Sequence, residues 1–178
     1  MRIISGKYKA RKIETLNSND TRPTTDKVRE NIFNILGRTD GDVLDLFAGS
    51  GALGIEAISR GADSAVFIDG ARDAVGILKK NTKGMEESVE IFRNDYRRAL
   101  KALAKRGRQF DLIFLDPPYH KDIVTDALAM IDELGILKAD GRIIAETHKD
   151  EGCQTTAFMS VKEAVYGTIK VNVLVKEG

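Results

Sequence analysis

The 178-residue sequence predicts an α/β fold, with a doubly wound, mostly parallel sheet of seven strands and helices on both faces. Five short apolar runs rich in β-branched residues alternate with segments of helical period, which is the pattern of a parallel sheet covered on both sides. A glycine-rich turn follows the first run, as in nucleotide-binding folds of this class. The last two runs alternate apolar and polar residues around Gly167, which predicts an antiparallel hairpin at the sheet edge and so one reversed strand.

Residues 1–22 are expected to form a small N-terminal unit ahead of one domain over residues 23–178. Residues 2–5 and 11–15 predict two short strands joined by a tight turn, hence a β-hairpin. The polar residues 17–22 predict a loop.

The first helix is expected to begin at Thr25 or Asp26 and to end at Gly37. Either polar residue can cap the first turn, and apolar residues recur at helical spacing after it. Glycine commonly ends a helix because it adopts the left-handed conformation without strain.

The central part of the chain alternates between apolar runs and longer amphipathic segments. The expected parallel strands cover residues 43–47, 65–69, 89–92, 111–115 and 141–146. The expected helices cover residues 52–60, a segment that ends near 83, 97–105 and 122–134. The terminal hairpin is expected over residues 160–166 and 168–176.

The composition excludes several classes of protein. The single cysteine, Cys153, cannot form an internal disulfide, and no Cys/His cluster has the spacing of a zinc site. No apolar run approaches the roughly 20 residues that span a bilayer, and the N-terminus lacks the apolar core of a secretory signal. We therefore expect a monomeric, cytoplasmic protein without a metal and without membrane contact.

Basic residues gather in two segments, although the net charge of the chain is only +1. Residues 1–29 hold eight Lys or Arg against three acidic residues, and residues 96–110 hold six against none. Two such segments on a mildly acidic body indicate contact with a nucleic acid. The alternative explanation is a solvated tail and a solvated helix face.

Gly49, Gly51 and Gly54 follow the first strand in the pattern G-x-G-x-x-G, which binds a nucleotide cofactor or simply makes a tight turn. Asp45 stands four residues before the first glycine, where it can meet a cationic amino-acid group. Asp69 ends the next strand, where a carboxylate can bind ribose hydroxyls. The position of Asp69 suits both NAD and S-adenosylmethionine, whereas that of Asp45 favours S-adenosylmethionine.

The fourth strand runs into Asp116-Pro117-Pro118-Tyr119. The two prolines restrict the backbone and carry no N–H, so the carbonyl groups here are held in place. The carboxylate of Asp116 and the carbonyl of Pro117 can together accept hydrogen bonds from an exocyclic amine. Tyr119 can stack on the base that carries this amine. The alternative is a rigid turn with Tyr119 in the core.

D-x-F-x-G-x-G followed by D-P-P-Y resembles the motifs of class I S-adenosylmethionine-dependent amino-methyltransferases. More narrowly, MRIISGKYKARKI at the N-terminus and RPTTDKVRE at residues 22–30 resemble the bacterial RsmD family, and the resemblance covers nearly the whole chain. It implies a Rossmann-like methyltransferase fold, S-adenosylmethionine as cofactor, and methyl transfer to N2 of a guanine in 16S rRNA within an assembling 30S subunit. Members of the family often carry Glu where this chain has Asp69.

The resemblance also implies three groups of site residues. The catalytic residues are Asp116, Pro117, Pro118 and Tyr119. The cofactor-binding residues are Asp45, Ala48, Gly49, Ser50, Gly51, Asp69, Asp95 and Tyr96, with Asp95 near the adenine amine. The RNA-binding residues are Arg2, Lys7, Lys9, Arg11, Lys12, Arg22, Thr24, Lys27 and Arg29.

Three other functions stay open. An NAD-dependent oxidoreductase would use the same glycines, but little chain remains for a substrate domain and D-P-P-Y would be unexplained. A non-catalytic RNA-binding module would not need the acidic residues at the strand ends. An adenine-N6 methyltransferase acting on DNA or RNA shares D-P-P-Y, although the DNA enzymes usually need extra chain for sequence recognition.

Overall fold

The computed structural model describes residues 1–16, 25–118, 122–152 and 155–177. The strands are β1 (Gly41–Asp45), β2 (Ala62–Asp69), β3 (Ser88–Arg93), β4 (Phe110–Leu115), β5 (Leu137–His148), β6 (Phe158–Tyr166) and β7 (Ile169–Lys176). The helices are α1 (Asp26–Leu36), α2 (Ala52–Ser59), α3 (Arg72–Thr82), α4 (Tyr96–Lys105) and α5 (Ile123–Leu134). Each element expected from residue 25 onward is present.

All seven strands form one sheet in the order β3-β2-β1-β4-β5-β7-β6. β7 runs antiparallel to both of its neighbours, which confirms the expected terminal hairpin and single reversed strand. The chain moves outward from β1 to β3 and then returns to β4 beside β1, so the strand order reverses between β1 and β4. In open α/β sheets, ligands bind at the carboxyl ends of the strands beside such a reversal.

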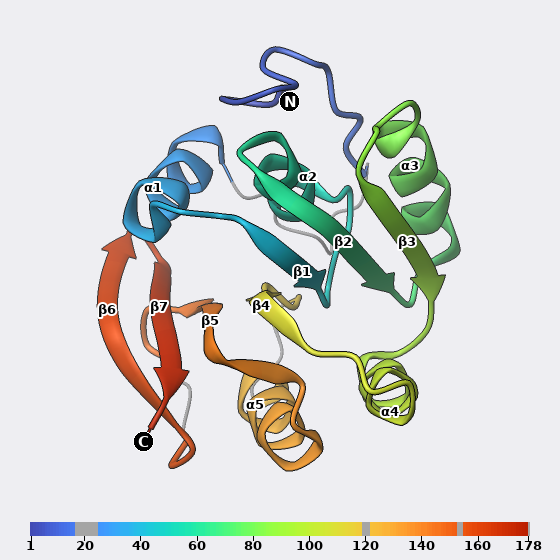
Figure 1. Cartoon of the computed structure of the whole chain (residues 1–178). Helices are drawn as coiled ribbons and strands as arrows, with labels where there is room; N and C mark the ends of the chain where they lie inside the picture. Colours follow the sequence, from blue (N-terminus) through green and yellow to red (C-terminus); the bar gives the residue numbers. More distant parts are fainter. Residues whose placement is uncertain (17–24, 119–121, 153–154, 178) are drawn as a thin grey trace.

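Helices α1, α2 and α3 cover one face of the sheet, and α4 and α5 cover the other (Figure 1). Successive strand residues point to opposite faces, and the core divides accordingly. Val43 and Phe114 pack in the cluster on the α1–α3 face. Leu44 and Ile113 pack in the cluster on the α4–α5 face. Both faces of the central strands are therefore buried, which explains why their sequences are continuously apolar.

Helix α1 has the boundaries that the sequence predicts. The hydroxyl of Thr25 accepts a hydrogen bond from the backbone N–H of Val28 (3.2 Å), so Thr25 is the N-cap. Gly37 follows the last residue with a positive φ of 68°, and its N–H donates to the carbonyl of Phe33.

In residues 1–16, the N-terminal segment, the expected hairpin is not shown as two full strands. A single antiparallel bridge joins Arg2 to Lys12. Backbone hydrogen bonds run beside it from Ile3 to Arg11 (3.0 Å), from Ala10 to Ile3 (2.8 Å) and from Ile13 to Met1 (2.8 Å). The segment also bonds to α2: the backbone N–H of Ile4 donates to the Glu56 carboxylate (2.8 Å), and that of Lys7 donates to the carbonyl of Ser59 (2.7 Å).

The N-terminal segment is part of the hydrophobic core. It crosses the outer side of α2 (Figure 1), and Ile3 and Ile13 are only 2% and 1% exposed. A Cβ at Gly6 would lie 1.9 Å from the carbonyl oxygen of Ser59, so only glycine allows this approach. The segment is therefore a packed element of the domain.

Candidate active site

Four carboxylates lie at the carboxyl ends of four neighbouring strands. Asp69, Asp45 and Glu146 belong to β2, β1 and β5, and Asp116 directly follows β4. The alternation of side chains places all four on the α1–α3 face of the sheet. Sequence analysis did not select Glu146, although it ends an apolar strand in the same way as the other acids.

Asp45 is the most deeply buried of the four predicted site carboxylates, with 2% of its surface exposed. Its Oδ2 accepts a hydrogen bond from the backbone N–H of Gly54 (3.1 Å). Burial, opposed by the hydrogen bond from Gly54 and helped by the negative charges of Asp116 and Asp69, raises the pKa of Asp45 to about 7. A cationic ligand at this point would stabilise the ionised form.

Residues 48–51 form a glycine turn that joins β1 to α2. The backbone N–H of Ala48 donates to the carbonyl of Ile68 (2.9 Å), and that of Gly51 donates to the carbonyl of Ala48 (2.8 Å). Gly51 has a φ of 85°, and a Cβ there would lie 2.7 Å from the Leu78 side chain. The turn is therefore tight, and it places backbone groups at the N-terminus of a helix, where nucleotide phosphates and carboxylates bind in many folds.

Asp69 is engaged with the glycine turn and with the chain after β2. One carboxylate oxygen accepts from the backbone N–H of Gly49 (2.9 Å), and the other accepts from that of Ala71 (2.9 Å). Each oxygen of a carboxylate has a second lone pair, so a ribose hydroxyl can still donate to it. Asp69 thus holds the glycine turn and the chain after β2 in place.

Asp95 and Tyr96 begin α4 at the same edge of the sheet. Asp95 caps the helix by accepting from the backbone N–H of Arg98 (3.0 Å). The hydroxyl of Tyr96 donates to Asp126 on α5 (2.6 Å), and its ring lies 5.3 Å from that of Phe47. Phe47, within the D-x-F motif, thus places an aromatic ring at this edge of the sheet. Sequence analysis did not include Phe47 in the site.

Asp116 lies beside Asp45, because β1 and β4 are paired in parallel with Asp45 opposite Phe114. Asp116 and Pro117 are half-buried and Pro118 is exposed. Tyr119, the last residue of the motif, lies outside the described residues, as do Arg22 and Thr24 of the predicted RNA contacts.

Arg29 was predicted to bind RNA, and this prediction is wrong, because the Arg29 side chain is completely buried and so cannot contact RNA. Its Nη2 donates to the carbonyl of Arg2 (2.6 Å), and its Nη1 lies 3.9 Å from the Glu56 carboxylate. Arg29 lies on the same face of α1 as Ile32 and Phe33. This spacing was visible in the sequence and could have identified Arg29 as an inward-facing residue.

The other basic residues of the N-terminal segment differ in their surroundings. Lys7 forms ion pairs with Glu86 (2.7 Å) and Glu87 (3.1 Å), and Arg11 donates to the carbonyl of Lys83. Four other residues predicted to bind RNA are exposed: Arg2, Lys9, Lys12 and Lys27.

The basic residues of the second basic segment, residues 96–110, are spread along α4 and beyond its end. Arg97 and Arg98 lie at its first turn beside the strand ends, and Arg97 forms an ion pair with Asp126 (2.9 Å). Arg108 lies past the other end of the helix and pairs with Glu90 of β3 (2.9 Å). Only the first two arginines are thus at the edge that carries the carboxylates.

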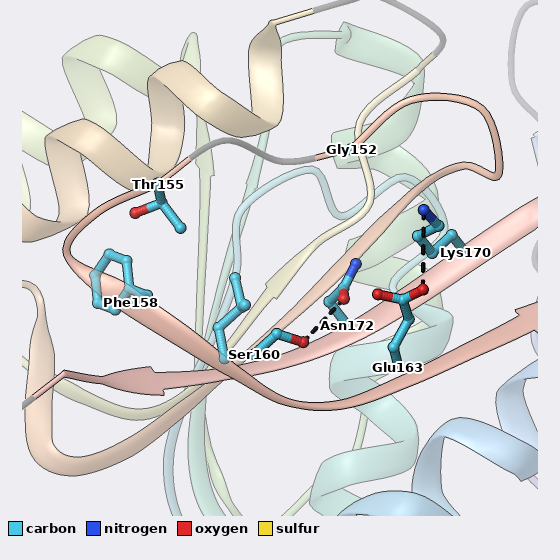
Figure 2. Close-up of a pocket in the computed structure, with 8 residues that line it drawn as sticks. Gly152, Thr155, Phe158, Ser160, Glu163, Lys170 and Asn172 are labelled. Carbon is cyan, nitrogen blue, oxygen red and sulfur yellow. Dashed lines mark hydrogen bonds and ion pairs between the residues drawn. The ribbon is translucent and has the colours of Figure 1, made fainter.

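A cavity of about 230 Å³ lies elsewhere, against β6 and β7. Figure 2 shows its polar wall, where the Ser160 hydroxyl donates to Asn172 (3.0 Å) and Lys170 pairs with Glu163 (3.9 Å). None of its lining residues belongs to the glycine turn or to the segment after β4.

Within the described residues, no His, Cys, Asp and Glu cluster is arranged to hold a metal ion. No helix in the same part of the chain is long and apolar enough to cross a membrane.

Comparisons with known proteins agree with this geometry. The family described as "Conserved hypothetical protein 95" matches residues 1–175. The "Putative rRNA methyltransferase YlbH" of Bacillus subtilis is 42% identical over 184 residues, with 100% of both chains covered. The "Ribosomal RNA small subunit methyltransferase D" of Haemophilus influenzae is 38% identical over 155 residues, which cover 85% of this chain and 80% of that protein.

The solved structures give the same result. The "Putative methyltransferase yhhF from Escherichia coli" is 30% identical to this chain, with a TM-score of 0.85 and coverage of 100% of this chain and 98% of that one. The sheet order and the antiparallel β7 are those of the class I methyltransferase fold. The chain therefore belongs to the Conserved hypothetical protein 95 family, the RsmD-like group that includes these methyltransferases.

Proposed function

We propose that this protein transfers a methyl group from S-adenosylmethionine to the exocyclic N2 of a guanine in 16S rRNA. The observation that carries the proposal is the position of Asp116 and Pro117 beside Asp45 and the glycine turn, at the point where the strand order reverses. The target amine and the cofactor would meet there. The rRNA methyltransferases among the relatives support an rRNA substrate.

The residues around the glycine turn fit S-adenosylmethionine, which is the cofactor of this enzyme class. The buried Asp45 suits the cationic amino-acid group, because burial raises its pKa to about 7 and a cation beside it would favour the ionised form. Asp69 is proposed to hold the ribose, and Asp95 and Tyr96 the adenine. When bound, the cofactor supplies a methyl group made reactive by a sulfonium.

Asp116 and the carbonyl of Pro117 are proposed to hold the target amine. The lone pair of guanine N2 is delocalised into the ring, so the amine is a poor nucleophile. Hydrogen bonds from its two hydrogens to these acceptors would favour an sp³ nitrogen and aim the lone pair. Positive charge grows on the nitrogen during attack, so the Asp116 carboxylate stabilises the transition state more than the ground state. The proton then leaves to Asp116 or to water.

Residues 1–22 are proposed as the RNA-binding extension of the methyltransferase domain, with a 30S subunit in assembly as the partner. Arg2, Lys9, Lys12 and Lys27 are exposed and available to phosphate groups. A guanine must be splayed out of its RNA fold to reach Asp116. Tyr119 is proposed to stack on it.

The test supplies the purified protein with labelled S-adenosylmethionine and three acceptors: 30S subunits that lack the modification, naked 16S rRNA and duplex DNA. The acceptors are then digested to nucleosides and separated. N2-methylguanosine from rRNA or 30S subunits is the expected product. Labelled N6-methyladenosine would reassign the enzyme to adenine, and cofactor binding without any product would indicate a binding module.

A further inference from the structure

We infer that Asn81 is a positioning residue that holds the glycine turn and couples it to the N-terminal segment. The inference rests on the proposed function, because this turn is the one proposed to bind the cofactor. Asn81 lies in the last turn of α3 and is 4% exposed. Its partners, Glu14 and Ser50, are 67 and 31 residues away along the chain.

Both N–H groups and the oxygen of the Asn81 side chain form hydrogen bonds. Nδ2 donates to the carbonyl of Ser50 (2.8 Å) and to that of Glu14 (3.0 Å), while Oδ1 accepts from the backbone N–H of Glu14 (2.9 Å). An amide has two N–H donors on one side and an oxygen on the other. If the amide were reversed, its oxygen would face two carbonyls, so the contacts determine its orientation.

Asn81 supplies the second of two hydrogen bonds that hold the peptide group between Ser50 and Gly51 in place. The N–H of this peptide donates to the carbonyl of Ala48 (2.8 Å), and its carbonyl accepts from Asn81. Because both ends of the peptide are bonded, it cannot rotate without breaking a buried hydrogen bond. Leu78, one helical turn before Asn81, fills the space beside Gly51. The last turn of α3 therefore sets both the position and the orientation of the glycine turn.

The same side chain ties the N-terminal segment to this turn. Asn81 satisfies both backbone polar groups of Glu14, next to the core residue Ile13. The side chain of Leu16 lies 4.0 Å from the position of a Cβ at Gly49. A shift of residues 13–16 would therefore disturb the glycine turn through the Asn81 bond to Ser50, and it would also move the Leu16 side chain that lies near Gly49.

The test compares Asn81→Leu and Asn81→Asp with a matched control, Thr82→Val. Thr82 is also buried in the last turn of α3, but its hydroxyl donates to Leu78 within the helix (2.8 Å). Aspartate keeps an acceptor for the Glu14 N–H and loses the donor to Ser50. We expect both Asn81 variants to raise the Kd for S-adenosylhomocysteine and the KM for S-adenosylmethionine about tenfold, the equivalent of one missing buried hydrogen bond. Turnover at saturating cofactor and the KM for RNA should stay within about threefold, as expected when only cofactor binding is weakened.

A double-mutant cycle with Leu16→Ala tests the coupling. Leu16→Ala should raise the Kd for S-adenosylhomocysteine in the wild-type background and clearly less in the Asn81→Leu background, because neighbours that share a partner are not additive. Additive effects, or Asn81 variants with the affinity of Thr82→Val, would overturn the inference. If Asn81→Leu does not fold, wild-type affinity in Asn81→Asp would overturn it equally. A wild-type protein that binds no S-adenosylhomocysteine would instead contradict the proposed function.

Discussion

Arg29 and Glu56 form an ion pair 3.9 Å long in which both side chains are completely buried. Glu56 also accepts from the backbone N–H of Ile4 (2.8 Å) and from Arg60 (2.8 Å), so one carboxylate joins α1, α2 and the N-terminal segment. Burial lowers the pKa of Arg29, while the Glu56 charge opposes that shift. The arrangement makes Arg29 part of the scaffold.

Arg29→Ala should therefore lower the free energy of unfolding strongly, by about 3–5 kcal/mol, because it removes one of the two cations beside the buried Glu56 carboxylate and the core packing of a fully buried side chain. Lys27→Ala is the matched control, since Lys27 lies on the same helix and is exposed. It should change the free energy of unfolding by less than about 0.5 kcal/mol. Urea unfolding of both variants measures the difference, and equal losses would contradict the structural role of Arg29.

Asp116→Ala should lower turnover by orders of magnitude and leave the Kd for S-adenosylhomocysteine within a few fold, because the proposed interaction strengthens only in the transition state. Asp111→Ala is the control from the opposite end of β4, where Asp111 pairs with Lys138 (3.0 Å). It should keep near-normal turnover. Near-normal methylation by Asp116→Ala would remove Asp116 from the proposed mechanism.

Asp45→Asn should raise the stability of the unliganded protein above neutral pH, although it should weaken cofactor binding. The pKa of Asp45 in the folded protein, about 7, lies above its usual value of 3.8, so the folded state binds more protons than the unfolded state between these values. The stability of the unliganded wild type therefore falls as pH rises toward 7. At pH 8, Asp45→Asn should be more stable than wild type by on the order of 1 kcal/mol or more, and the difference should vanish near pH 4.

The same substitution should weaken binding of S-adenosylhomocysteine. A cationic ligand favours the ionised carboxylate, so binding to the wild type should release a proton and tighten between pH 6 and 8. Calorimetry in buffers of different ionisation enthalpy measures that proton. A pH-independent Kd in the wild type would argue against contact between Asp45 and the cationic group.

The exposed lysines are expected to act by binding phosphate groups of the RNA. The triple variant Lys9→Gln, Lys12→Gln, Lys27→Gln should lower the slope of log K for RNA against log salt by about 0.7–0.9 for each phosphate group that is no longer neutralised. Its Tm and its affinity for S-adenosylhomocysteine should stay those of wild type. The control neutralises three basic residues in the second half of α4 and just after it (Lys101, Lys105, Arg106), and an equal decrease of the slope there would refute the assignment of the RNA surface.

Deletion of residues 1–16 is a poor test of RNA binding. It would remove Ile3 and Ile13 from the core and would free Glu56 and Asn81 from their backbone partners. We expect loss of stability and of cofactor binding together, so point substitutions at exposed residues are the informative experiment.

The parallel sheet was predictable because β-branched runs and helical periods are local signals. The strand-end acids Asp45, Asp69 and Asp116 followed from the same pattern, because parallel strands end at one edge. Asn81 could not be found this way. It lies in the polar run Lys79-Lys80-Asn81-Thr82, and its partners are backbone atoms of distant residues.

The docking of the N-terminal segment on α2 could not be predicted for a related reason. Its alternation of apolar and polar residues indicates a hairpin, and residues 1–3 do bond to residues 10–13, but Ile4 and Lys7 also donate to Glu56 and Ser59 of α2. Local pattern cannot reveal docking on a helix that comes fifty residues later.

The docking of the N-terminal segment also constrains the order in which the protein matures during translation. Ile4 bonds to Glu56, 52 residues later in the chain, and Tyr8 bonds to Glu87, 79 residues later. Ile3 and Ile13 therefore stay exposed to solvent and to chaperones until these later residues have been synthesised. The N-terminal segment is made before the helix on which it docks and reaches its final place only after that helix has formed.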